Sequence, residues 1–337
     1  MSSRATRQDV ALNAGVSGAT VSRVYNDPSR VDPTTAERVR ASAIALGFVP
    51  DRHASALRRR SSTTFLFLEI ERPIPYRWAS QRYFQSLYGE IMRALLHELQ
   101  GTPWHMEAVT LTSRELIPLL SSGRDFSGIL GFDVDDQETA DDLAALGRPV
   151  VCCHHNGQLR GVHTVTTDNF AGGVLQAQYL NSLGHTKVAY LTGRRDEVLS
   201  HERRWRGFTS LVNPVRALDD VLGFSAGEAA GQLLAQDFRR GALTAVACVN
   251  DITAWGVIQG LRSQGIHFPQ DAVVVGYDNL VLTELLDGGL PTVEARLPHI
   301  YTRAFAILAK QASKPTAEIH ETIVPELVLP SRSAIRS

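Results

Sequence analysis

The sequence predicts a chain of two parts that differ in fold class: an all-α N-terminal segment, then an α/β region of two doubly wound parallel sheets. Three observations support this prediction. Residues 7–46 place apolar side chains at helical spacing, with breaks near Gly15 and Pro33. From Phe65 onward, short apolar runs alternate with helical stretches, as buried parallel strands alternate with crossover helices. In a chain of 337 residues, this second region is long enough for two such sheets.

Three short helices are expected in the N-terminal segment. The first spans residues 7–14 and ends at Gly15, which tolerates the left-handed conformation of a helix C-cap. The second begins at once, with Ser17 as its N-cap, and runs to Asn26. A helix, a short glycine-containing turn and a second helix form the helix-turn-helix pattern, although an ordinary three-helix bundle would show the same spacing.

The third helix is expected from about Pro33 to Leu46, because proline suits the first helical turn and Gly47 follows as a stop signal. Together the three helices would enclose a small apolar interior. The side chains expected to face it are Val10, Ala11, Ala14, Val21, Val24, Val39, Ile44 and Leu46.

Charge is distributed unevenly along the chain. Residues 1–60 contain ten arginines, no lysine and five acidic residues, a net charge of +5, whereas the whole chain carries −1 and the remainder therefore −6. A basic head on an acidic body is typical of nucleic-acid binding, although a solvated arginine-rich surface would give the same count. The first 25 residues hold no apolar run of signal-peptide length and no later run reaches the length of a membrane span, so a cytoplasmic protein without membrane contact is expected.

Two stretches of the N-terminal segment resemble a known family. The string DVALNAGVSGATVSRVYND, followed by VDPTTAERVRASAIALGFVPDRHASAL, is similar in order and spacing to the headpiece of the LacI/GalR family of bacterial transcriptional regulators. The resemblance implies a helix-turn-helix DNA-binding domain at residues 1–58, a linker at 59–64, and an effector-binding and dimerisation domain at 65–337. It also implies a repressor that binds a pseudo-palindromic double-stranded DNA operator as a homodimer, with no enzymatic activity and no cofactor.

The same resemblance assigns the DNA contacts. It places the recognition helix, Ser17 to Asn26, in the major groove, where Arg23 can make a bidentate contact to guanine. Gly18 and Ala19 occupy the positions that the family varies to choose its operator, and neither carries a hydrogen-bonding side chain, so direct readout there should be poor. The expected contacts on this helix are Ser17, Gly18, Ala19, Thr20, Ser22, Arg23 and Asn26.

Residues 51–58 resemble the hinge helix of the family. Ala54 and Leu57 would reach the DNA there, and in a dimer two copies of Leu57 would insert into the minor groove at the centre of the operator and bend the duplex. Without the resemblance, Leu57 would be interpreted as a residue that packs an ordinary linker helix.

The α/β region divides into two lobes. Strands are expected at residues 64–70, 127–132, 148–155, 163–168, 187–193, 245–251 and 272–279, separated by helical stretches. The resemblance implies a sensor domain like the periplasmic binding proteins. Its N-lobe would cover residues 65–162 and 293–322, and its C-lobe residues 163–292 and 323–337.

Polar residues follow several of the expected strands. In open α/β sheets, ligands bind at the carboxyl ends of the strands, so these residues are candidates for a binding site. They are Asp133, His154, His155, Thr192, Asn250, Asp251, Tyr277 and Asp278. A structural role is the alternative for each, and Asp168 and Asp251 precede helices that they would cap with or without a ligand.

The resemblance narrows these candidates. By position in RRWRGF, VND and GYDN, Arg204, Asn250 and Asp278 match the effector-contacting arginine, asparagine and aspartate of the family, a set that suits the hydroxyls of a sugar or similar polyol. Phe224 lies near an aromatic residue that packs on the sugar ring in some relatives. His154 replaces a usual acid or amide, and a histidine there would also accommodate an acidic or phosphorylated effector.

The residues leave two other functions open. The string GFSAG at residues 223–227 matches the nucleophile elbow of hydrolases, but Ser225 with Glu228 also fits a helix capping box. A sugar-binding protein without DNA function would share the two-lobed architecture but not the headpiece. No metal site is expected at residues 152–155, because Cys152 and Cys153 would point to opposite faces of a strand as buried free thiols.

Overall fold

The computed structural model describes residues 6–26, 31–46, 48, 63–71, 76–112, 125–132, 134, 136–153, 159–286 and 288–330. For residues 26, 71 and 76–87 it describes the backbone alone. The chain forms two compact units, residues 1–62 and 63–337. Several residues singled out above lie outside the described residues: Gly47, Ala54, Leu57, Asp133, His154 and His155.

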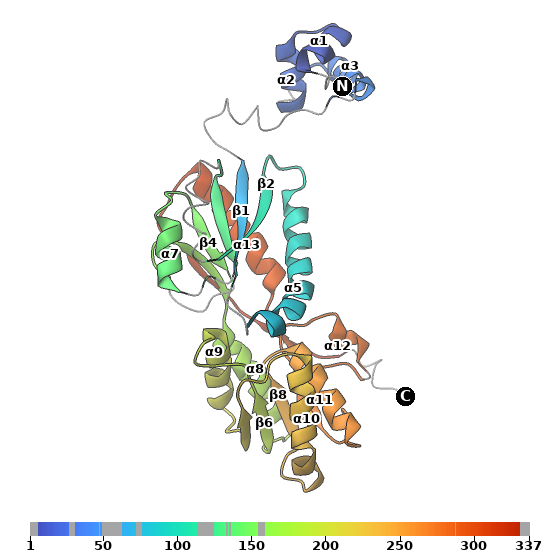
Figure 1. Ribbon diagram of the computed structural model, residues 1–337, viewed down its shortest axis with the longest axis vertical. Helices are drawn as coiled ribbons and strands as arrows, with labels where there is room; N and C mark the ends of the chain where they lie inside the picture. Colours follow the sequence, from blue (N-terminus) through green and yellow to red (C-terminus); the bar gives the residue numbers. More distant parts are fainter. Residues whose placement is uncertain are drawn as a thin grey trace. The chain divides into compact units, whose positions relative to one another are not determined.

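The first unit contains three helices, α1 (Arg7–Asn13), α2 (Gly18–Asn26) and α3 (Pro33–Ala45), where the sequence predicts them (Figure 1). Gly15 has the left-handed conformation expected after α1, with φ of 62°. At the start of α2, the Ser17 hydroxyl accepts a hydrogen bond from the Thr20 N–H at 3.1 Å, as an N-cap does. The predicted helix-turn-helix is therefore confirmed in its backbone and in both of its turn signals.

Small apolar side chains fill the interior of this unit. The most buried are Val10, Ala14, Val21, Val24, Ala36, Val39 and Ala43. The prediction for Ile44 is wrong, because that side chain is 82% exposed. α3 turns Ala36, Val39 and Ala43 inward, and Ile44 lies about 100° further round the helix from Ala43. Leu46 packs half-buried against the same interior, as expected.

The second unit contains two parallel sheets, which confirms the predicted fold class. The first sheet has six strands in the order β11-β5-β4-β3-β1-β2. Their bounds are β1 (Thr64–Glu71), β2 (His105–Thr112), β3 (Gly128–Phe132), β4 (Val150–Cys153), β5 (His163–Thr167) and β11 (His320–Ile323). Helices α5 (Tyr76–Leu99) and α13 (Leu297–Ser313) pack on one face, and α7 (Gln137–Ala144) packs on the other.

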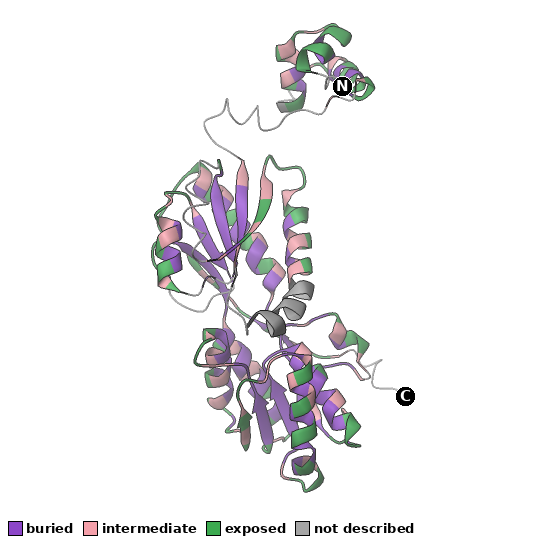
Figure 2. Cartoon of the chain, in the orientation of Figure 1, coloured by how far each residue is buried: buried purple, intermediate pink, exposed green. Residues whose placement is uncertain are grey.

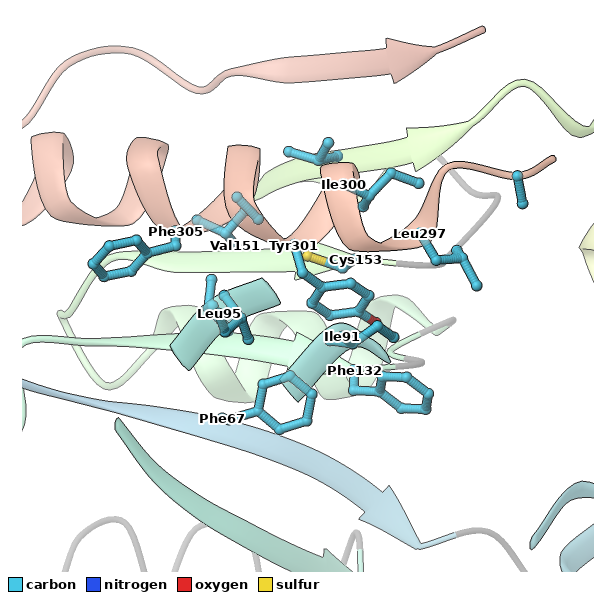
Figure 3. Close-up of a cluster of buried hydrophobic side chains, with 14 of the residues drawn as sticks. Phe67, Ile91, Leu95, Phe132, Val151, Cys153, Leu297, Ile300, Tyr301 and Phe305 are labelled. Carbon is cyan, nitrogen blue, oxygen red and sulfur yellow. The ribbon is translucent and has the colours of Figure 1, made fainter. Parts of the chain in front are cut away.

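The two faces of this sheet have separate apolar cores. Figure 3 shows the core beneath α13, where Tyr301 stacks on Phe132 with ring centres 5.9 Å apart, close to Phe67 and Cys153. Cys152 belongs to the core on the opposite face, beneath α7. The neighbouring cysteines therefore point to opposite faces and are buried thiols, as the sequence predicts.

The second sheet has four strands in the order β7-β6-β8-β9. Their bounds are β6 (Val188–Leu191), β7 (Arg216–Leu218), β8 (Ala245–Cys248) and β9 (Val273–Val275). Helices α8 (Asn169–Ser182) and α9 (Leu199–Thr209) cover one face, and α10 (Phe224–Arg239) and α11 (Asp251–Ser263) cover the other. The short helix α12 (Leu282–Leu285) follows β9. Figure 2 shows the central strands of both sheets as buried ribbons between partly exposed helices.

Helices α8 and α9 touch through their backbones. Gly173 lies against the carbonyl oxygen of Arg204, and Gly207 lies against that of Phe170, so a Cβ atom at either glycine would overlap the oxygen. Because α9 lies so close, the Arg204 side chain reaches Asn169 at the start of α8.

The predicted boundary between the lobes, at residue 162, is wrong. β5 (His163–Thr167) pairs with β4 and β11, so it belongs to the six-stranded sheet, and the chain leaves that sheet only before α8. A strand and the helix that follows it usually belong to the same lobe. Here β5 lies in the six-stranded sheet, whereas α8 packs on the four-stranded sheet. The chain returns through β10 (Thr292–Glu294), which pairs antiparallel with β12 (Glu326–Val328). No helix in the described part of the chain is long and apolar enough to span a membrane.

Candidate functional site

The first candidate site is the exposed face of α2. Ala19 and Arg23 are both exposed, and their spacing of four residues places them on one face of the helix. Val21 and Val24 are buried on the other face, with at most 2% of each residue exposed. The helix is thus held by one set of side chains and presents another set to solvent.

The N-terminal turn of α2 is held by its own hydroxyls. Besides accepting the Thr20 N–H, the Ser17 hydroxyl lies 2.9 Å from the Thr20 hydroxyl. A Cβ atom at Gly18 would meet only the Arg7 Nε, at 3.6 Å, which is an ordinary contact. An alanine would therefore fit at position 18. Ser22 is half-buried, and Asn26 is described by its backbone only.

The second candidate site lies in the second unit, at the carboxyl ends of β8 and β9. Its central side chain is Arg204 of α9, which is buried. Its Nε donates to the Asn169 Oδ1 at 2.8 Å, and an Nη donates to the Val249 carbonyl oxygen at 2.7 Å. The guanidinium carbon lies 3.6 Å from the centre of the Tyr277 ring, a cation–π contact. Sequence patterns single out Arg204 but not Asn169, the residue that orients it.

Asp278 faces the same guanidinium. The other Nη of Arg204 lies 4.0 Å from the Asp278 Oδ1, and the carboxyl side chain is 1% exposed. Both oxygens lack a hydrogen-bond partner among the described residues, and burial holds the pKa of this carboxyl well above its usual range. Buried polar atoms are normally satisfied, so an unsatisfied carboxyl beside an arginine is a strong indication of a ligand contact.

The cap of α11 is Asn250 and not its neighbour Asp251. Asn250 is the N-cap of α11, because its Oδ1 accepts a hydrogen bond from the Thr253 N–H at 2.8 Å. The expectation that Asp251 caps this helix is wrong, since its carboxylate accepts from the Leu280 N–H and the Thr292 hydroxyl instead. The cap leaves the amide NH2 group of Asn250 to donate elsewhere. Asp168 caps α8 through the Ala171 N–H, as predicted.

Phe224 opens α10 and is half-buried. Its ring packs edge-to-face on Trp255 of α11, with centres 4.8 Å apart. The helix is capped by Gly223 without any side-chain hydrogen bond, so the predicted capping box of Ser225 is wrong. Ser225 lies exposed within the first helical turn. The backbone N–H of Gly223 donates to the Thr253 hydroxyl, which links this aromatic pair to the turn that Asn250 caps.

Two further hydroxyls lie in this lobe, of which the sequence singles out Thr192 but not Tyr190. The Tyr190 and Thr192 hydroxyls, on and just after β6, are buried without a hydrogen-bond partner among the described residues. Both lie on the side of the sheet that α8 and α9 cover, as does Arg204. Among the described residues, no group of acidic, histidine and cysteine side chains is arranged to hold a metal ion.

Each of the two candidate sites lies in a part of the chain that matches a known family model. A family model described as "Bacterial regulatory proteins, lacI family" matches residues 6–51, and one described as "Periplasmic binding protein-like domain" matches residues 177–332. The chain belongs to the LacI family. The predicted family and fold class are thus confirmed, and a LacI-family chain of this kind is a DNA-binding transcriptional regulator.

Relatives of this LacI-family chain are regulators of similar length. The transcriptional repressor CytR of Escherichia coli is 28% identical over 91% of this chain and 89% of CytR. The Lac repressor dimer bound to operator and an anti-inducer has the same fold, with a TM-score of 0.76, 21% identity, and 96% and 97% of the two chains covered. The complex of the regulator CelR with cellobiose has a TM-score of 0.64, 24% identity, and 97% and 99% coverage.

Proposed function

We propose that this LacI-family regulator is a cytoplasmic repressor that binds its operator through α2 and responds to a small polar effector bound at Arg204, Asn250 and Asp278. The observation that supports the effector site is Asp278, whose two buried carboxyl oxygens lack a partner in the described part of the chain. A ligand that donates hydrogen bonds would supply what the protein does not. Catalysis by Ser225 finds no support, because this hydroxyl sits on an exposed helical turn rather than a strand-to-helix elbow.

The DNA contacts in this proposal lie on the exposed face of α2. Arg23 reads a guanine, and Ala19 reaches at most a thymine methyl group. The other α2 residues assigned to DNA are Ser17, Gly18, Thr20, Ser22 and Asn26. Ala54 and Leu57 add minor-groove contacts from the hinge segment. A three-helix unit makes too few contacts alone for tight specific binding, so the chain acts as a homodimer on two half-sites.

The effector class that fits the site best is a neutral carbohydrate. Asp278 offers two acceptor oxygens, while Arg204 and Asn250 offer donors, which together match hydroxyl groups. The aromatic pair of Phe224 and Trp255 offers an apolar surface for a sugar ring. An ionised phosphate or carboxylate group has no hydrogen to donate to the unpartnered oxygens of Asp278, so this site disfavours the acidic effector that His154 left open. CelR, whose cellobiose complex shares this fold, binds a neutral sugar.

The test combines operator selection with a ligand screen. An operator is selected from random DNA with the full-length protein, and neutral sugars and sugar phosphates are then screened by thermal shift. A neutral sugar should raise the melting temperature and change operator affinity by roughly 5- to 150-fold. Asp278→Ala should abolish both effects and keep non-specific DNA binding.

The matched control is Asp196→Ala, which removes an exposed carboxylate from the same lobe and should respond like wild type. Asp278→Ala should keep the fold, because the Asp278 carboxyl accepts no hydrogen bond in the described part of the chain and gives up only its 4.0 Å ion pair with Arg204. A full sugar response in Asp278→Ala would refute the assigned pocket, and a response to sugar phosphates alone would refute the effector class.

A further inference from the structure

The turn that presents Asp278 has an unusual backbone. Asp278 and Asn279 follow β9, and both have positive φ, at 108° and 59°. Such values are uncommon for residues other than glycine, and two in succession persist only where the surrounding structure holds them. The turn that carries the proposed effector contact therefore needs an anchor.

Asp251 contacts this turn at both ends. Its backbone N–H donates to the carbonyl oxygen of Tyr277 at 2.9 Å, just before the turn. Its Oδ2 accepts from the N–H of Leu280 at 2.8 Å, just after the turn. One residue thus grips the two residues that flank Asp278 and Asn279.

The second carboxylate oxygen of Asp251 binds a residue of β10. It accepts a hydrogen bond from the Thr292 hydroxyl at 2.6 Å, and the N–H of Asn279 lies 3.4 Å from the same hydroxyl oxygen. The N–H of Asp278 donates to the carbonyl oxygen of Val293 at 2.7 Å. Through these bonds the turn is tied to the strand by which the chain returns to the six-stranded sheet.

We propose that Asp251 is the residue that positions Asp278 for effector binding, by clamping the turn from Tyr277 to Leu280 against α11 and Thr292. This proposal rests on the proposed role of Asp278 as an effector contact. Both carboxylate oxygens of Asp251 are occupied, by the Leu280 N–H and the Thr292 hydroxyl, so Asp251 acts through the turn and not by touching the ligand. An ordinary capping role does not account for its carboxylate, because Asn250 already caps α11.

The side chain at position 251 must accept two hydrogen bonds at once. A carboxylate accepts from the Leu280 N–H and the Thr292 hydroxyl together, and an alanine accepts from neither. An asparagine still accepts from Leu280 through its oxygen and can donate to the Thr292 oxygen through its nitrogen. Asp251→Asn should therefore restore part of what Asp251→Ala removes.

The experiment measures amide hydrogen exchange in the full-length protein without any ligand. In Asp251→Ala, the amides of Asn279 and Leu280 should exchange about 10- to 100-fold faster than in wild type, and the amides of α8 and α9 should be unchanged. Asp251→Asn should return the turn towards the wild-type rate. Asp237→Ala is the matched control, because Asp237 is a buried aspartate of the same lobe that pairs with Arg216 and Arg240 instead of the turn.

A second pair of variants decides the question if Asp251→Ala does not fold. Thr292→Val removes the hydroxyl with little change of shape and should speed exchange at Asn279, whereas Thr292→Ser keeps the hydroxyl and should not. Equal acceleration over the whole lobe, or no acceleration at the turn, would overturn the proposal. Because no ligand is present, this result is independent of the sugar screen. If the screen finds a neutral sugar, the variants whose turn amides exchange fastest should bind that sugar most weakly.

Discussion

On α2, the two exposed side chains assigned to the DNA bases are not the side chains that pack the helix against the rest of its unit. Ala19 and Arg23 are exposed, while Val21 and Val24 are buried beneath them. Around Asp278, by contrast, the assigned side chains are themselves part of the packing, since Arg204 is buried and bonded to two other elements. The difference teaches that Ala19 and Arg23 can change with little effect on folding, whereas a change of Arg204 also alters folding.

The largest effect should come from Arg204→Ala. The substitution removes a buried guanidinium that donates to the Asn169 oxygen and the Val249 carbonyl, and it should lower the free energy of unfolding by about 3–5 kcal/mol. Urea denaturation of the second unit measures this loss. Arg206→Ala, on the exposed side of the same helix, is the control and should cost less than about 1 kcal/mol. If both variants lost a similarly small free energy of unfolding, Arg204 would not contribute to folding and the contrast with α2 would be wrong.

A smaller and purely functional effect is expected from Arg23→Ala. It should weaken operator binding by roughly 1–3 kcal/mol, with little change on random DNA, because it removes a base contact. Fluorescence anisotropy with both DNAs measures the two affinities. Arg38→Ala on α3 removes the same charge and should weaken both DNAs alike. If Arg23→Ala weakened both DNAs equally, Arg23 would be a phosphate contact.

The smallest effect on stability should come from Ala19→Gln. The new amide can bond to adenine from the exposed face of α2, so the preferred base at one operator position should change. The free energy of unfolding should stay within about 0.5 kcal/mol of wild type. Operator selection with the variant and thermal denaturation measure the two quantities. Ala36→Gln, at a buried position of α3, should instead destabilise the unit. An unchanged base preference would show that position 19 does not face the DNA bases.

The elements that the sequence predicts carry strong local signals. Ser17 and Gly15 mark the turn between the first helices, and continuous apolar runs mark the central strands such as β4 and β8. The strands β2 and β7 give no such signal, because β2 lies at the sheet edge with several exposed residues and β7 has only three. Predictions therefore succeed where both faces of a strand are buried.

The sequence predicts which residues belong to the candidate site but not the role of each one. Asn250 and Asp251 are both good N-cap residues, so the sequence around them cannot decide which one caps α11. The choice depends on Leu280 and Thr292, which approach from segments about thirty and forty residues away. Likewise, Asn169 becomes a partner of Arg204 only through the packing of α8 on α9.

The contact between α8 and α9 has a mechanical consequence. Sliding one helix along the other would drive the backbone at Gly173 or Gly207 into a neighbouring carbonyl, so shear between these helices is blocked. Asn169 and Arg204 therefore travel together as one rigid body, with a fixed distance between them. Any movement that opens or closes this site must occur as a rotation about the connecting segments, in the manner of a hinge.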